Sequence, residues 1–279
     1  MSLPFIPSDA ALLCLQAGVV LGPRPLELPP RLRRVRGRAW GLVPIASIVG
    51  VIFAIRYVSS TATGLTYLAL VAVPLLAAAA LGATMRGARP ILALLAIPLF
   101  VLAWLARTSL LGEAAAALLS ALSCVTLGVL LAMVTPPAWL KAGIILMAGA
   151  DVWLVASDLL QAPNQTLVAA APAGGLPQLQ SELFGSVSMG YGDLFVAALL
   201  GAVLADVRRQ RLGALLTLAL AGLFDLLFFV IHELPATVPV ALALIVMELF
   251  PRVRRARRAR VSAGRPRSRP AAATPPPAR

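Results

Sequence analysis

Long apolar runs, separated by short polar or basic segments, cover most of the chain between residues 5 and 250. Runs of about 18–20 apolar residues are long enough to cross a bilayer as α-helices. The predicted spans lie near 39–57, 64–84, 90–106, 112–134, 138–161, 185–206, 212–231 and 235–250, and a weaker candidate lies at 5–22. The pattern therefore predicts an all-α protein, a polytopic transmembrane helical bundle of about nine spans, or eight if 5–22 does not cross.

The composition of the chain agrees with this pattern. Of the 279 residues, 60% are apolar and 13% are charged, whereas soluble domains are about 45–50% apolar and about 25% charged. An ordinary soluble domain is therefore excluded. The two cysteines, Cys14 and Cys124, lie far apart in apolar surroundings and outside any CxxC motif. The sequence thus suggests neither a zinc site nor a redox pair.

Basic residues are distributed unevenly between the two sides of the predicted bundle. If the spans alternate, one side receives the basic segments, which are 24–38, 86–89, Lys141, 208–211 and the tail from 251. The other side receives connections with few charges, including 162–184, and Arg107 is the exception. Because basic loops stay in the cytoplasm, we expect a cytoplasmic C-terminus and a 162–184 loop on the outer side.

The C-terminal segment 251–279 is rich in Pro, Arg and Ala and holds ten arginines. This composition predicts a disordered cytoplasmic tail that is attracted to anionic lipid headgroups. No aromatic residues interleave with the arginines, so nucleic-acid binding is not expected. Lys141 is the sole lysine among 24 basic residues. This preference for arginine, with abundant alanine, suggests a GC-rich, bacterial genome. Together with the predicted spans, it leads us to expect a multi-pass protein of the bacterial plasma membrane.

Four aspartates fall within predicted spans, namely Asp151, Asp158, Asp193 and Asp225. A carboxylate at the centre of a bilayer costs about 2.5–3.5 kcal/mol or more, so such residues are rare and usually functional. The connection between the spans of Asp151 and Asp193 has its midpoint near residue 173, 22 residues after the first and 20 before the second. Two antiparallel helices would hold these carboxyls at nearly the same depth, where they would share a proton. Such a pair can perform aspartyl proteolysis, and the alternative is two unrelated polar residues, each hydrogen-bonded to a neighbouring helix.

Two further motifs accompany these aspartates. Gly190 and Gly192 flank Tyr191 just before Asp193, and glycine there would let an extended substrate approach the carboxyl. Small residues at these positions would also suit helix packing. The segment Pro235–Thr237 interrupts the start of the last span, where freed carbonyls could pair with an unwound substrate strand, although proline is also common at helix N-termini.

Together these motifs resemble the presenilin and signal peptide peptidase family of GxGD intramembrane aspartyl proteases. That family carries one Asp in its sixth span, Gly-x-Gly-Asp in its seventh and Pro-Ala-Leu at the start of its ninth. The matching positions here are Asp151, Gly190–Asp193 and Pro235–Thr237. The motifs cover 138–250, and the first half of the chain matches only as a set of hydrophobic spans. Ala150 stands where the family has an aromatic residue, and Thr stands where the last motif has Leu.

The resemblance implies an intramembrane aspartyl endopeptidase that cleaves transmembrane segments or signal peptides and needs no metal or organic cofactor. It implies catalytic roles for Asp151 and Asp193. The residues that it implies in substrate binding are Gly190, Tyr191, Gly192, Pro235, Ala236 and Thr237. The expected organisation is N-terminal transmembrane helices in 1–134, catalytic helices in 135–250 and the tail in 251–279.

Three other functions stay open at this point. A potassium channel also carries Gly-Tyr-Gly-Asp, but Met189 precedes the motif here, where a selectivity filter uses a small side chain. A prepilin peptidase pairs its GxGD with an earlier aspartate, which would be Asp158, although its active site faces the cytoplasm and Phe195 stands in place of its usual Lys. A proton-coupled transporter would use the same intramembrane aspartates, with Asp225 among them.

Overall fold

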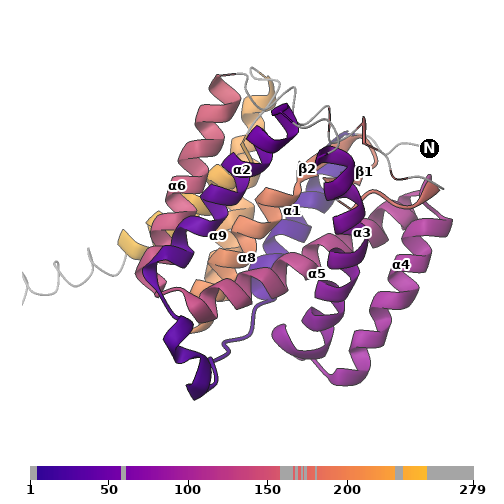
Figure 1. Ribbon diagram of the computed structural model, residues 1–279. Helices are drawn as coiled ribbons and strands as arrows, with labels where there is room; N and C mark the ends of the chain where they lie inside the picture. The colour runs from indigo at the N-terminus through magenta and orange to yellow at the C-terminus, as the bar shows by residue number, and fades with distance from the viewer. Residues whose placement is uncertain are drawn as a thin grey trace, which may run out of the picture. The chain divides into compact units, whose positions relative to one another are not determined.

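The computed structural model describes residues 5–57, 61–157, 166, 169–170, 172, 175–179, 181–229 and 235–249. Contacts divide the chain into two compact units, Met1–Leu244 and Ile245–Arg279. The described part of the first unit is predominantly helical (Figure 1), as the sequence predicts. The expected disordered tail, 251–279, and the candidate residue Asp158 lie outside the described residues.

The helices follow the predicted apolar runs closely. They are α1 (Phe5–Leu21), α2 (Val43–Tyr57), α3 (Thr61–Ala79), α4 (Ala96–Leu105), α5 (Leu110–Val134), α6 (Pro137–Ala156), α8 (Tyr191–Ala205), α9 (Gln210–Phe224) and a last helix, Thr237–Leu249. Shorter segments extend or connect them: the 3-10 helices η1 (Pro30–Val35), η2 (Arg38–Leu42), η4 (Pro90–Leu95) and η6 (Asp225–Phe229), and the π-helical turn η3 (Ala80–Thr84).

Local sequence explains where α5 and α6 begin. At the start of α5, the Ser109 hydroxyl accepts a hydrogen bond from the Gly112 N–H at 3.3 Å, and Glu113 lies in the first turn. A capping hydroxyl and an acidic first turn both stabilise a helix N-terminus. Helix α6 begins with Pro137 directly after Pro136, at a position where the missing N–H of proline costs nothing.

A β-hairpin precedes α8. Its strands are β1 (Ser181–Phe184) and β2 (Val187–Gly190), which pair antiparallel. The two-residue turn contains Gly185 with φ 61°, a left-handed conformation that glycine adopts without strain. The Gly185 N–H donates to Glu113 Oε2 at 2.7 Å, which ties the hairpin to α5. The predicted span 185–206 therefore begins as a turn and a strand, and only its later part is helical.

Four helices of the described chain are long and apolar enough to cross a membrane: Thr61–Thr84, Leu110–Val134, Pro137–Ala156 and Gln210–Leu227. The apolar helices α1, α4 and α8 and the last helix are shorter than this. The protein thus has the helices of a membrane protein, and the nine-span arrangement stays a prediction.

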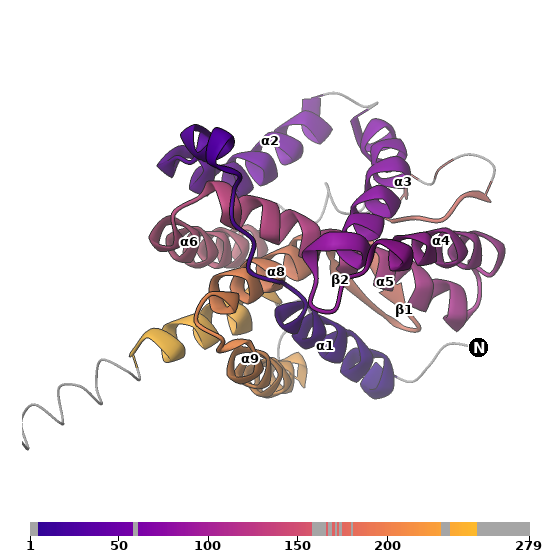
Figure 2. The ribbon, with the colours of Figure 1, turned by 90° about the horizontal axis from the view of Figure 1, so that it is seen from below.

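Helix α5 is central to the first unit. It makes its most extensive contacts with α8, α3 and α4, and Figure 2 shows α3 and α4 on one side with α6 and α9 on the other. Small residues allow α5 and α8 to approach closely, since a Cβ on Gly128 would lie 2.9 Å from the Cβ of Ala198. Almost every residue of α8 from Leu194 to Ala205 is buried, so α8 is a core helix.

The outer helices expose large apolar side chains. Leu75 on α3, Leu105 on α4 and Trp153 on α6 are 66%, 77% and 69% exposed. Many other large apolar side chains are exposed in the described chain, and so much exposed apolar surface is unfavourable in water. These faces agree with a bundle surrounded by lipid.

Candidate active site

The two principal candidate aspartates come together where α6 and α8 meet. These helices are in contact, and the negative charge of Asp151 acts on the Asp193 carboxyl. Both residues are half-buried. This juxtaposition is the one that their equal depth in two antiparallel helices predicts, and it joins residues that are far apart in the sequence.

Asp193 lies in the first turn of α8, at the junction with the hairpin. Its Oδ2 accepts a hydrogen bond from the Gly190 N–H at 3.0 Å, and Gly190 is extended, with φ −77° and ψ 143°. A carboxylate here is favoured by the positive end of the helix dipole. A Cβ on Gly190 would lie 3.1 Å from Asp193 Oδ2, whereas a Cβ on Gly192 would meet nothing within 4 Å. Open space therefore adjoins the motif at Gly192.

Tyr191 anchors the start of α8 to α5. Its hydroxyl lies 2.7 Å from the Ser123 hydroxyl, and its carbonyl accepts a hydrogen bond from the Cys124 thiol at 3.7 Å. The side chain also packs against a buried apolar cluster that includes Leu119 and Leu179. These contacts hold the Gly-Tyr-Gly-Asp motif on the central helix, and a role for Tyr191 in substrate binding stays a prediction.

Thr237 holds Asp151 from the N-terminus of the last helix. The Thr237 hydroxyl donates to Asp151 Oδ2 at 2.6 Å, and the Thr237 backbone also hydrogen-bonds Asp151. Thr237 is only 5% exposed. The threonine that departs from the family motif therefore makes a specific contact with a candidate catalytic group.

The carbonyls of Pro235 and Ala236 already accept hydrogen bonds. The Gln16 side-chain N–H donates to the Ala236 carbonyl at 3.1 Å, and the Val238 N–H donates to the Pro235 carbonyl at 3.2 Å. The segment before the last helix is thereby tied to α1. The pairing of these carbonyls with a substrate strand stays a prediction.

Asp225 pairs with a different carboxyl. It is the first residue of η6 and forms a side-chain hydrogen bond with Asp9 on α1. Within the described chain its Oδ2 is buried without a hydrogen-bond partner. A hydrogen bond between two carboxyls requires a proton on one of them. The sequence did not identify this pair, because Asp9 lies in the weakest predicted span.

Two other supporting residues were not identified from the sequence. Ser123 and Gln16 are fully buried, and they hydrogen-bond Tyr191 and the Ala236 carbonyl. Buried polar groups need hydrogen-bond partners, so polar residues inside apolar helices were the available signal. Their partners follow only from the packing of the helices.

Comparison with models of known protein families finds no match to the chain, and neither a curated protein nor a solved structure matches it. The resemblance to the presenilin and signal peptide peptidase family therefore rests on the motifs alone. Among the described residues, no group of three His, Cys, Asp or Glu side chains is placed to hold a metal ion.

Proposed function

We propose that this protein is an intramembrane aspartyl endopeptidase, with transmembrane segments or signal peptides as its substrates. One observation carries the proposal: Asp151 and Asp193, from separate helices, lie close enough for their charges to interact. Two carboxyls at this separation in a partly buried site do not both ionise readily, and they hold one proton between them. That state supplies a base and an acid at one place.

The pair would hydrolyse a peptide bond with one water molecule. The ionised carboxyl takes a proton from water as the water oxygen adds to the scissile carbonyl carbon, while the protonated carboxyl gives its proton to the carbonyl oxygen. The resulting gem-diol loses a hydroxyl proton to one carboxyl as the amide nitrogen gains a proton from the other. The C–N bond then breaks, and the pair again holds one proton.

The surroundings of the pair support this chemistry. Gly190 N–H and Thr237 Oγ1 each hold one oxygen of a carboxyl, which fixes the orientation of both groups. The open space at Gly192 lies one residue from Asp193 and would admit a substrate backbone. Strand β2 runs directly into this motif, and an exposed strand edge is a known acceptor of extended peptides.

Cleavage of a fluorescent transmembrane peptide by the purified protein in detergent tests the proposal. Asp151→Asn and Asp193→Asn are the matched variants, since an amide oxygen still accepts the hydrogen bonds from Thr237 and Gly190 but an amide cannot ionise. Each variant should lose activity by about 10²-fold or more, the usual contribution of a general acid or base. Asp206→Asn, an exposed aspartate at the end of α8, should cleave like the wild type.

The outcomes separate the candidate mechanisms. Cleavage by the wild type, blocked by a transition-state mimic of aspartyl proteases and lost in both variants, supports the proposal. Cleavage that survives in the double Asn variant belongs to a contaminant or to another site and rejects it. Loss in Asp158→Ala with retention in Asp151→Ala would instead favour the prepilin-peptidase pairing.

Proton-coupled transport is a second candidate, favoured by the hydrogen bond between Asp9 and Asp225. A second proton-holding pair in the bundle has no part in the proteolytic mechanism, whereas proton relays use chains of such groups. If the wild type cleaves no peptide but carries protons into liposomes under a pH gradient, and Asp225→Asn abolishes this flux, the aspartates serve transport.

A further inference from the structure

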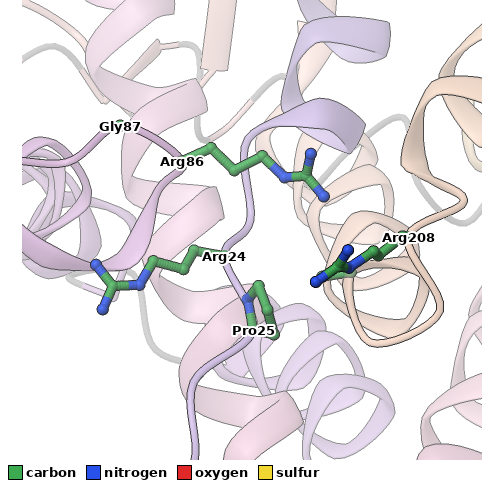
Figure 3. A pocket seen from close by; sticks show the side chains of 6 residues that line it. Arg24, Pro25, Arg86, Gly87 and Arg208 are labelled. Carbon is green, nitrogen blue, oxygen red and sulfur yellow. The ribbon is translucent and has the colours of Figure 1, made fainter.

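Three basic loops meet around one cleft in the first compact unit. The cleft encloses about 460 Å³ and is lined by Arg24, Pro25, Arg86, Gly87, Ala205 and Arg208. These residues come from the segment after α1, from the connection between η3 and η4, and from the end of α8 with the turn that follows it. Figure 3 shows the Arg86 and Arg208 side chains pointing toward each other across the cleft, while the Arg24 guanidinium points away.

Backbone hydrogen bonds hold these loops together. The Arg24 N–H donates to the Thr84 carbonyl at 3.0 Å, and the Arg86 N–H donates to the Gly22 carbonyl at 2.8 Å. The buried Gln210 side chain donates to the carbonyls of Pro23 and Gly201 at 2.8 and 2.9 Å. The three loops therefore form one framework, and the arginines project from fixed positions rather than from independent surface segments.

The conformation of Arg208 is unusual. Its φ of 53° is left-handed, and it is the one non-glycine residue of the described chain with a positive φ. Such a conformation is unfavourable for an L-residue with a Cβ, and glycine would adopt it freely. Arginine occupies this turn position in spite of that backbone preference, and its side chain points into the cleft.

The described lining of the cleft carries only positive charge. Its lining contains three arginines and no acidic residue. In the part of the chain that the structure describes, Arg24, Arg86 and Arg208 form no salt bridge, and Asp206 is exposed and does not line the cleft. Arg24, Arg86 and Arg208 are all exposed, so water screens part of the repulsion between their guanidinium groups. An anion between Arg86 and Arg208 would remove the rest of it.

We propose that this cleft binds a phosphate group, with Arg86 and Arg208 as its principal ligands and Arg24 at its edge. Guanidinium groups bind phosphate oxygens through paired, charge-assisted hydrogen bonds. The cleft adjoins the ends of the apolar helices α1 and α8, so the phosphate of an anionic phospholipid would enter it with its acyl chains beside the bundle. A free phosphate would use the same ligands, and the inference does not depend on proteolysis.

Two probes distinguish these sources. The full chain in detergent is titrated with a short-chain phosphatidylglycerol, with phosphatidylcholine of equal chain length for comparison, and separately with inorganic phosphate. Saturable binding of phosphatidylglycerol alone identifies a lipid headgroup site, and saturable binding of inorganic phosphate identifies a site for free phosphate. Absence of saturable binding with both anionic probes overturns the proposal.

A matched pair of double variants tests the residues. Arg86→Gln with Arg208→Gln should weaken binding by at least about tenfold, because charge-assisted hydrogen bonds are among the strongest polar contacts. Arg89→Gln with Arg211→Gln removes the same charge from neighbouring positions that are exposed like Arg86 and Arg208 but do not line the cleft. This variant should bind nearly as the wild type does. Equal loss in both double variants would mean bulk electrostatic attraction and would overturn the proposal.

A second substitution keeps the test decisive if the glutamine pair does not fold. Arg86→Lys with Arg208→Lys keeps the charge but lacks the planar fork that contacts two phosphate oxygens at once. Binding should again fall below that of the Arg89→Gln, Arg211→Gln variant, with thermal unfolding of each protein measured alongside. Wild-type affinity in the lysine variant would reject Arg86 and Arg208 as paired phosphate ligands.

Discussion

Removal of the Thr237 hydroxyl tests whether this group supports Asp151 in catalysis, because the rest of the fold stays unchanged. Thr237→Val keeps the size and branching of a side chain that is 5% exposed, and it deletes the donor to Asp151 Oδ2. The 2.6 Å length of this O–H···O contact is typical of a bond to an ionised oxygen, which is commonly 2.5–2.7 Å. Such bonds contribute about 1.5–3 kcal/mol. If the whole contribution supports the transition state, the rate of cleavage should fall about 10- to 150-fold.

The assay compares three proteins by initial rates of peptide cleavage and by thermal unfolding. Thr237→Ser restores the hydroxyl and should recover most of the rate, although it lacks the methyl group. The Thr237 backbone contact with Asp151 is unchanged in both variants. A Thr237→Val protein that cleaves at the wild-type rate would show that the hydroxyl does not position Asp151, and equal loss in Val and Ser variants would assign the effect to packing.

Three further substitutions have distinct expected results. Gly192→Ala and Gly64→Ala each place a Cβ in open space within a helix, so each should raise stability slightly, by up to about 1 kcal/mol. Cleavage should fall in Gly192→Ala if substrate occupies that space, and Gly64→Ala is the control that should cleave like the wild type. Tyr191→Phe removes the 2.7 Å contact with Ser123 and should cost about 0.5–1.5 kcal/mol of stability. It should add no cost to Ser123→Ala, which by itself removes this contact and the hydrogen bond to the Ser120 carbonyl. Gly201→Ala would drive its Cβ into the backbone of α1 and should lower stability by about 1–3 kcal/mol, measured by thermal unfolding; a neutral result would contradict the close packing of α1 and α8.

Much of the helical layout can be predicted from the sequence, because the spacing of apolar residues and the length of apolar runs are local properties of the chain. Each predicted apolar run contains a helix. The capping residue Ser109 before α5 and Pro137 at the start of α6 lie close to the predicted beginnings of these spans. The hairpin was not predicted, because the hydrophobic pattern places 181–184 in the connection 162–184 and 185–190 at the beginning of the next span. Its register depends on the turn at Gly185 and on the distant Glu113, which a local pattern does not contain.

The candidate site, too, could be predicted from the sequence only in part. Asp151 and Asp193 could be identified from sequence because carboxylates within apolar runs are costly and equal spacing from one connection sets equal depth. The contact of Thr237 with Asp151 and that of Asp9 with Asp225 could not, since each joins helices whose packing is decided by many side chains. The family motif has Leu at the position of Thr237, so comparison with the motif alone would count this residue as a departure.

The short length of α8 has a consequence for where a substrate would be cut. From Asp193 to Ala205 the helix advances about a dozen residues, or roughly 18 Å, whereas the hydrocarbon core of a bilayer is about 30 Å thick. Ala205 lines the cleft of Arg24, Arg86 and Arg208. The length of α8 therefore sets the distance between the carboxyl pair and these basic loops. In the proposed protease, a substrate helix lying alongside would be severed well inside the bilayer. The cleavage product on the side of the basic loops would be too short to span the membrane and could leave it.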